Sequence, residues 1–278
     1  MRLVGCGDSW CWGAELVDPI EEPIPIMKLD GDNHHRHLKP VNEAYRLSHR
    51  YLNLFADKIN ASEIIDLSKP SYSNDAISRT LIEWLSIEGY TSGRDTSELF
   101  ITIGWTSPER TEFYFKDKYP DPWQPFGPWV LDYDFKDSKV NEMMRLYFEK
   151  FYCEEEFLLR WVSQVWQTEM FLKQLNIKYV MHQAFYHHYQ EMIHQWDDKK
   201  YTAKMNKMEL GLKKLWSSID SARFINKDDT KQGTMHHYIL SQVNNDPQKV
   251  FEVFHPNANG HSIWADYLYE YCTANKLI

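Results

Sequence analysis

Four short apolar segments, separated by stretches with helical spacing, constrain the fold of this 278-residue chain more than any other feature. They are predicted to be buried strands at residues 2–6, 63–67, 98–103 and 177–182. Between them, apolar residues recur at helical spacing over 42–58, and Asn74 can cap a further helix. Such alternation predicts βαβ units and a mainly parallel sheet covered by helices, which is an α/β fold.

Two longer stretches depart from this alternation. Residues 109–137 are aromatic and rich in proline and show no helix or strand period, so we expect a loop that forms a lid or a wall. The longest helical pattern runs over 140–175, and residues 186–250 are predicted to be a mixed insertion with a helix near 205–217. The length suits one domain, residues 1–278, that carries a helical insertion.

Charge and composition exclude several classes of protein. The net charge is −9 and no long basic run occurs, which argues against a nucleic-acid partner. No segment approaches the ~20 apolar residues that span a bilayer, and the N-terminal apolar run meets a glycine too early for a signal peptide. The four cysteines form no CxxC pair, which predicts free thiols. We therefore expect a cytoplasmic protein with no membrane association.

The first predicted strand is followed at once by Gly7, Asp8 and Ser9. Open α/β sheets bind their ligands at the carboxyl ends of strands, so the Ser9 hydroxyl starts in a suitable position for a nucleophile. The same tripeptide is also an ordinary turn in which Ser9 only caps a helix. On this motif alone both readings remain open.

A second motif stands near the other end of the chain, where His255 and Pro256 precede an apolar helical pattern. A serine hydroxyl is a weak nucleophile unless a base removes its proton, and His255 could be that base. The alternative is that His255 merely caps the last helix. The two motifs together favour a nucleophile and its base.

In type and order these motifs resemble the first and last sequence blocks of the SGNH/GDSL hydrolases. Residues 71–75 follow the second strand, as the family's glycine-containing block does, and residues 104–107 follow the third, as its Gly-x-Asn-Asp block does. The resemblance covers the sheet-forming parts of the chain but not residues 110–250 in detail. The segments at 7–13 and 104–110 also look like SGNH-like proteins of tailed phages.

The resemblance implies a flavodoxin-like three-layer α/β/α sandwich that hydrolyses esters through an acyl-enzyme. His255 would be the base for Ser9, and Glu252 would orient the imidazole where the family usually has aspartate. Backbone amides of Ser9 and Ser71 would hold the oxyanion together with Thr106. Ser71 replaces the family's glycine and Thr106 its asparagine, so three positions depart from the family pattern.

The expected substrate is an ester of a small molecule or of a glycan, with no cofactor and no metal. The aromatic segment at 123–129 and the family's common substrates suggest an O-acyl group on a carbohydrate. Arg110 could contact a carboxylate or phosphate of the substrate. The residues predicted to bind substrate are Asp8, Trp10, Asn74, Trp105 and Arg110. The sequence leaves the oligomeric state open.

Two other functions compete with ester hydrolysis. A non-catalytic binding or assembly protein could keep the scaffold after losing the family's asparagine and aspartate. A metal-dependent phosphoesterase could use Asp8 with histidines, although no ligand motif surrounds Asp8. One polar stretch matches no ligand spacing and is expected to be a solvated loop, namely Asp30, Asp32, His34, His35 and His37. Four histidines dispersed over a predicted strand and helix receive no role, namely His182, His187, His188 and His194.

Overall fold

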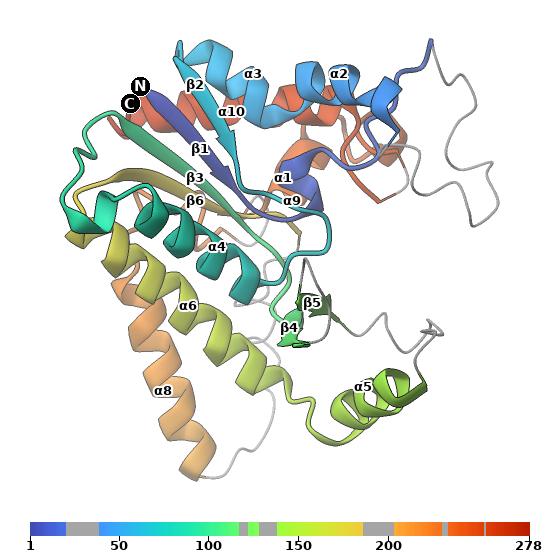
Figure 1. Ribbon diagram of the computed structural model, residues 1–278, viewed down its shortest axis with the longest axis vertical. Helices are drawn as coiled ribbons and strands as arrows, with labels where there is room; N and C mark the ends of the chain where they lie inside the picture. The colour runs from blue at the N-terminus through green and yellow to red at the C-terminus, as the bar shows by residue number, and fades with distance from the viewer. Residues whose placement is uncertain (21–38, 117–121, 128–137, 186–202, 230–232, 253) are drawn as a thin grey trace.

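The computed structural model describes residues 1–20, 39–116, 122–127, 138–185, 203–229, 233–252 and 254–278 (Figure 1). Its central sheet has four parallel strands in the order β2-β1-β3-β6. The strands are β1 Arg2–Cys6, β2 Glu63–Asp66, β3 Leu99–Trp105 and β6 Lys178–Gln183. In the register, Leu3 lies between Ile64 and Phe100. The four predicted strands and their parallel arrangement are confirmed.

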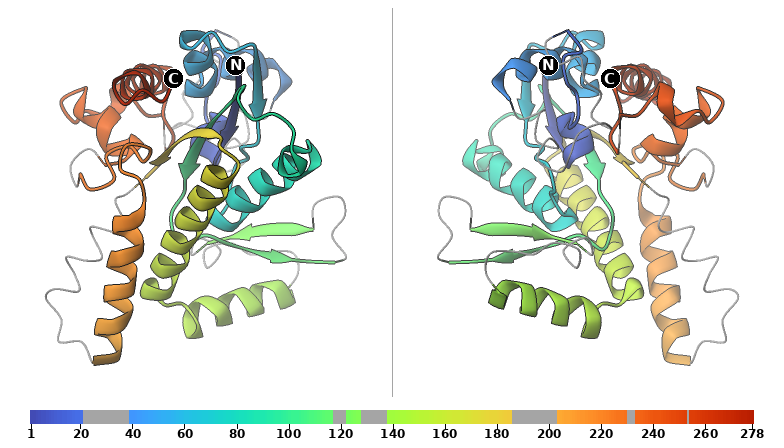
Figure 2. Two further views of the ribbon diagram at one scale, coloured as in Figure 1. Left: turned by 90° about the vertical axis from the view of Figure 1, so that its left-hand side faces the viewer. Right: turned by 90° about the vertical axis from the view of Figure 1, so that its right-hand side faces the viewer.

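Helices cover both faces of this sheet (Figure 2). One face packs against α4, α6 and α8, and the other against α3, α9 and α10. Side chains alternate between the faces, so that Val4 and Ile101 join the first core while Leu3 and Phe100 join the second. Burial on both faces explains why the strands are almost continuously apolar. The predicted α/β/α architecture is confirmed.

The helices begin and end as follows: α1 Ser9–Trp12, α2 Pro40–His49, α3 Tyr51–Lys58, α4 Asn74–Ile87, α5 Ser138–Lys150, α6 Glu154–Gln174, α8 Ala203–Ser218, α9 Met235–Ser241 and α10 Ala258–Ala274. In the strand order, β1 lies between β2 and β3. The connection that follows β1 packs α3 on one face of the sheet, and the connection that follows β3 packs α6 on the other face. This is the switch point at which doubly wound sheets place their ligand crevice.

Two helical patterns that the sequence shows as continuous are each broken in two. The pattern at 42–58 breaks at Arg50, whose backbone is extended and whose guanidinium donates to Asp66. The N–H of Tyr51, which begins α3, donates to the ring of His261 instead of to a helix carbonyl. The pattern at 140–175 breaks before α6, because Cys153 is extended at φ −145° and ψ 112°.

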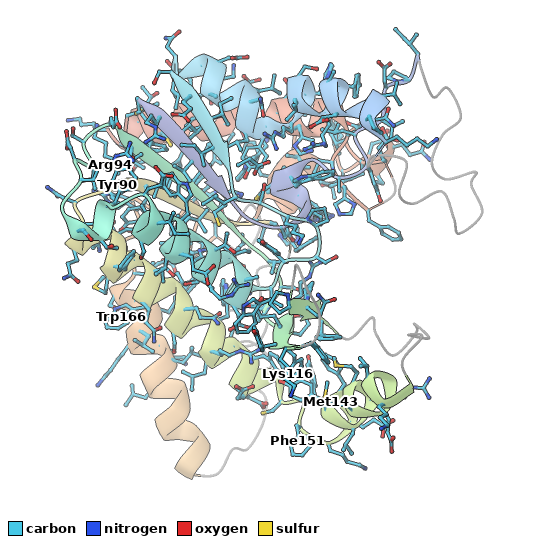
Figure 3. The ribbon with its side chains drawn as sticks, in the orientation of Figure 1. Tyr90, Arg94, Lys116, Met143, Phe151 and Trp166 are labelled. Atoms are coloured by element: carbon cyan, nitrogen blue, oxygen red, sulfur yellow. The ribbon has the colours of Figure 1, made fainter. Side chains whose placement is uncertain are left out.

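The aromatic segment at 109–137 contains a hairpin that the sequence analysis did not predict. Strands β4 Thr111–Tyr114 and β5 Trp123–Phe126 pair antiparallel as a separate sheet of two strands. Pro125 fits there because each strand of a two-stranded sheet has a free edge. The hairpin shares a small core with α5, on which Met143 remains exposed, as does Phe151 directly after the helix (Figure 3).

Two glycines allow α1 to lie directly on the ends of β1 and β3. A Cβ added at Gly7 would lie 2.1 Å from Cys11 Sγ, and one at Gly104 would lie 2.3 Å from the same sulfur. No side chain fits in either place. Cys11, Cys6 and Cys272 are buried free thiols, as the cysteine spacing predicts, whereas Cys153 is exposed.

Two histidines are fully buried near these glycines. His182 at the end of β6 lies edge-on to Tyr51, and neither of its ring nitrogens has a hydrogen-bond partner among the described residues. Burial lowers the pKa values of His182 and His261 to about 3. Both imidazoles are therefore neutral in the folded protein at neutral pH.

We predict that replacing His182 with Phe reduces the acid sensitivity of folding. An unfolded histidine binds a proton near pH 6.5, whereas folded His182 resists protonation down to about pH 3. The free energy of unfolding should therefore fall as pH drops from about 6.5 towards 3. Within this window His182→Phe should remove a slope of about 1.4 kcal/mol per pH unit.

Urea unfolding of both proteins at a series of pH values measures this slope. Other titrating groups contribute equally to both proteins, so the difference between the two curves isolates His182. Parallel curves would contradict the assignment of the slope to this histidine.

Candidate functional site

The structure brings Ser9 and His255 together from opposite ends of the chain. Ser9 begins α1 directly after β1, and His255 lies in the loop before α10. The Nε2 atom of His255 is 2.8 Å from the Ser9 Oγ atom. This is hydrogen-bond distance, as a serine nucleophile and its base require.

The helix-capping alternatives for these two residues do not hold. The side chain of Asp8, not that of Ser9, accepts the N-cap hydrogen bond of α1 from the Trp10 N–H. The side chain of Asn257, not that of His255, caps α10 by accepting from the Gly260 N–H. Neither the Ser9 hydroxyl nor the His255 ring is therefore needed as a cap.

A buried carboxylate stands behind the imidazole, and it belongs to Glu15. Its Oε1 atom is 3.1 Å from His255 Nδ1, which is ion-pair distance although the pair is not aligned as a hydrogen bond. Its Oε2 atom accepts backbone N–H groups of Phe254 at 3.0 Å and of His255 at 3.1 Å. Glu15 therefore fixes the loop that carries the histidine.

Glu252, the residue predicted to orient the imidazole, has no contact with the ring among the described residues. Its backbone N–H donates to the carbonyl oxygen of His255 at 3.0 Å, which closes a tight turn, and the residue is exposed. Burial of part of its carboxyl group and the nearby charge of Glu15 raise its pKa. Glu15, not Glu252, is thus the carboxylate beside the imidazole.

The sequence signal for Glu15 lies in the turn that follows Ser9. Gly13 ends α1 in the left-handed region at φ 84°, and Glu15 itself has φ 65°. A positive φ is unfavourable for a residue with a side chain and often marks a functional site. Gly13 is compatible with a turn in the sequence, but the spacing of the residues does not point to Glu15 as the carboxylate beside His255.

Asp8 ties the ends of β1 and β3 together beneath Ser9. It is completely buried, and its Oδ2 atom accepts the Thr106 hydroxyl at 2.7 Å and an N–H of Arg110 at 3.3 Å. The Thr106 hydroxyl proton is used in this bond, whereas the sequence predicts that it donates to an oxyanion. Arg110 also lies over the Phe185 ring, at 5.1 Å.

Asn74 extends the same network to α4. Its Oδ1 atom accepts the Thr106 N–H at 3.0 Å, and its Nδ2 atom donates to the carbonyl oxygens of Thr106 and Ser107. Asn74 is 2% exposed and Trp105 is 0% exposed within the core beside α4. Both were predicted to bind substrate, and both are instead enclosed by protein.

Two of the predicted residues remain, Ser71 and Trp10. Ser71 is exposed in the loop after β2 and has φ 69°. Trp10 is 2% exposed, with its ring centroid 6.3 Å from that of His255 and 4.8 Å from that of Phe185. Trp10 therefore forms a wall beside the imidazole rather than an open platform for substrate.

Further aromatic rings continue this wall. His236 stacks on Phe251, with centroids 5.0 Å apart, and both pack against Trp10. Burial, together with the neighbouring His237, lowers the pKa of His236 to about 4, so its ring is neutral at neutral pH. An apolar surface thus borders one side of the Ser9 and His255 pair.

Within the described residues, no group of three or more His, Cys, Asp or Glu side chains could hold a metal ion. Likewise, no helix that the structure describes is long and apolar enough to cross a membrane. His182 is buried in the core. The other residues considered as ligands lie outside the described ranges, namely Asp30, Asp32, His34, His35, His37, His187, His188 and His194.

Comparison with known proteins identifies a family and structural likenesses. A search of curated protein sequences gives no match. Among solved structures, a lipase from a goat rumen metagenome aligns over 98% of this chain and 97% of its own, with 13% identity and a TM-score of 0.40. The model of a family of unknown function, DUF6071, matches residues 33–278. Since this match covers most of the sequence, the chain belongs to the DUF6071 family.

Proposed function

We propose that this protein is a serine-dependent ester hydrolase of the SGNH/GDSL type. The observation that carries the proposal is the 2.8 Å contact between Ser9 Oγ and His255 Nε2, with the Glu15 carboxylate 3.1 Å behind the ring. A serine in contact with a histidine, whose other ring nitrogen faces a carboxylate, recurs in many unrelated acyl-transfer enzymes. The site at the carboxyl end of β1 also agrees with where α/β folds perform their chemistry.

In the proposed reaction, His255 Nε2 takes the proton of Ser9 while Oγ attacks the carbonyl carbon of the ester. The tetrahedral adduct collapses when the bond to the leaving alcohol breaks, and the imidazolium returns its proton to that alcohol. Water, activated by the same nitrogen, then cleaves the acyl-serine and releases a carboxylic acid. The Glu15 carboxylate stabilises the imidazolium in both steps.

Two backbone amides are the candidate donors to the oxyanion. The N–H of Ser9 is at the first position of α1, so no acceptor within the helix is available to it. Ser71 takes the backbone conformation typical of glycine where the family has glycine, and its N–H is the second candidate. A missing side-chain donor costs roughly 3 to 4 kcal/mol in transition-state stabilisation, so we expect slow turnover.

The acyl group of the proposed substrate lies against the wall of Trp10, His236 and Phe251, which favours a small apolar acyl chain. For the alcohol part we propose a carbohydrate.

The metal-dependent phosphoesterase is disfavoured because the Asp8 carboxylate already accepts hydrogen bonds from Trp10, Thr106 and Arg110.

A non-catalytic binding protein is the second candidate. The observation that favours it is the bond from the Thr106 hydroxyl to Asp8, which leaves the proposed oxyanion site without the third donor of the family. Labelling separates the two functions, because a fluorophosphonate reacts with an activated serine and not with an ordinary hydroxyl.

Ser9→Ala tests the assignment of the nucleophile. Loss of the nucleophile should lower kcat for p-nitrophenyl acetate by roughly 10³-fold or more and abolish fluorophosphonate labelling. Ser86→Ala, which removes an exposed hydroxyl on α4, is the matched control and should retain both. Equal turnover by Ser9→Ala and the unaltered protein would rule out this mechanism.

A pair of variants separates the role of Glu15 from that of Glu252. Glu15→Gln removes the negative charge behind the imidazole while keeping an oxygen that can accept the two loop amides, so kcat should fall roughly 10²-fold or more. Glu252→Gln, the matched control, should change kcat by less than about threefold, because its carboxylate does not contact the ring.

Steady-state kinetics over a range of pH, with thermal unfolding of each variant, measures this difference. If Glu15→Gln unfolds at the same temperature as the unaltered protein, the loop of His255 keeps its position and the fall in kcat reports the loss of charge. A larger fall in kcat for Glu252→Gln than for Glu15→Gln would return the role to Glu252.

A further inference from the structure

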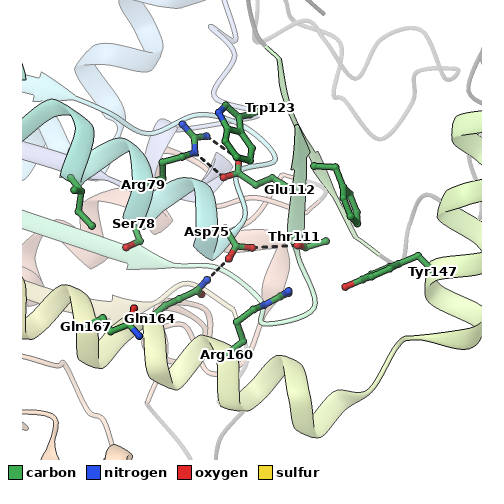
Figure 4. A pocket seen from close by; sticks show the side chains of 12 residues that line it. Asp75, Ser78, Arg79, Thr111, Glu112, Trp123, Tyr147, Arg160, Gln164 and Gln167 are labelled. Carbon is green, nitrogen blue, oxygen red and sulfur yellow. Dashed lines mark hydrogen bonds and ion pairs between the residues drawn. The ribbon is translucent and has the colours of Figure 1, made fainter. Parts of the chain in front are cut away.

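A pocket of about 570 Å³ lies between α4, α6 and the β4–β5 hairpin (Figure 4). Two pairs of consecutive residues connect it with the network around Asp8. Asn74 belongs to the network around Asp8, while Asp75 lines the pocket. In the same way Arg110 contacts Asp8, while Thr111 lines the pocket.

One wall of the pocket is held rigidly by an ion pair. The Arg79 guanidinium donates two hydrogen bonds of 2.9 Å to the two carboxylate oxygens of Glu112. The same guanidinium lies 4.6 Å from the centre of the Trp123 ring. The charges of Arg79 and Glu112 thus offset each other, and the indole is fixed at the edge of the pocket.

The opposite wall offers polar groups with capacity for a ligand. Asp75 accepts hydrogen bonds from Gln164 and from the Thr111 hydroxyl, and it forms no ion pair that the described residues show. Arg160 lies over the Phe157 ring at 4.3 Å, and its buried Nη2 atom has no hydrogen-bond partner within the described ranges. Gln167 is exposed and lines the same space.

The charges and hydrogen-bonding groups of the pocket select the class of ligand. Two carboxylates and two guanidinium groups give no net charge, so a strongly charged ligand gains little there. A hydroxyl group both donates and accepts, and therefore suits a wall that presents a carboxylate, a guanidinium and amides together. The Trp123 and Tyr147 rings add apolar surface against which C–H groups can pack.

We propose that this pocket binds one neutral pyranose unit of a glycan. The volume is within the range of small-ligand sites and accommodates a single sugar ring. On the basis of the proposed function, this sugar is part of the alcohol whose ester is cleaved at Ser9. Arg160 and Gln167 would donate to its hydroxyl groups, and Asp75 would accept from them.

Binding is tested on the Ser9→Ala protein, so that hydrolysis plays no part. Saturation-transfer NMR would use the methyl pyranosides of glucose, galactose, mannose, xylose and N-acetylglucosamine, with methyl glucuronide as the acidic probe. We expect at least one neutral pyranoside to bind, and Arg160→Met or Gln167→Ala to weaken its Kd by roughly tenfold. Arg145→Met, on the exposed side of α5, is the matched control and should leave Kd unchanged.

Three results would overturn the inference. They are no binding of any neutral pyranoside, binding that both pocket variants retain, and preference for methyl glucuronide. If these occur while Ser9 still hydrolyses p-nitrophenyl acetate, only the pocket assignment fails. Sugar binding without any Ser9-dependent turnover would instead support the pocket assignment and contradict the proposed hydrolase function.

Discussion

The site depends on one buried carboxylate that joins the two ends of the chain. Glu15 accepts two backbone N–H groups from the loop of His255 and also lies beside the ring of that histidine. Since hydrogen bonds to a charged acceptor are stronger than those between neutral groups, this contact fixes the loop more firmly than packing alone would. The unfavourable backbone at Glu15 is tolerated because the surrounding turn determines where its side chain lies.

A second buried carboxylate, that of Asp8, holds the chain around Ser9. Asp8 caps α1, receives the hydroxyl of Thr106 and contacts Arg110, while Asn74 holds the backbone of Thr106 from α4. Residues that follow three different strands are thereby held in one network. Burial of such a network is favourable only when its polar groups are paired, which these bonds accomplish for Asp8 and Asn74.

Much of the fold could be predicted from the sequence, because each buried strand carries an uninterrupted apolar segment. Ser9 and His255 could be singled out because they stand where a strand and a loop meet helices. The role of Glu15 could not be, since it depends on two residues with positive φ, and spacing along the chain does not reveal backbone conformation. The hairpin of β4 and β5 was missed because its strands are short and one contains Pro125.

The parallel sheet has a consequence for the order in which the protein acquires its site. Parallel strands join only through long connections, and Ser9 is 246 residues from its partner histidine. During synthesis the sheet can form around β1 long before residue 255 leaves the ribosome. Ser9 would therefore lack its contact with His255 on the nascent chain until α10 docks against α3.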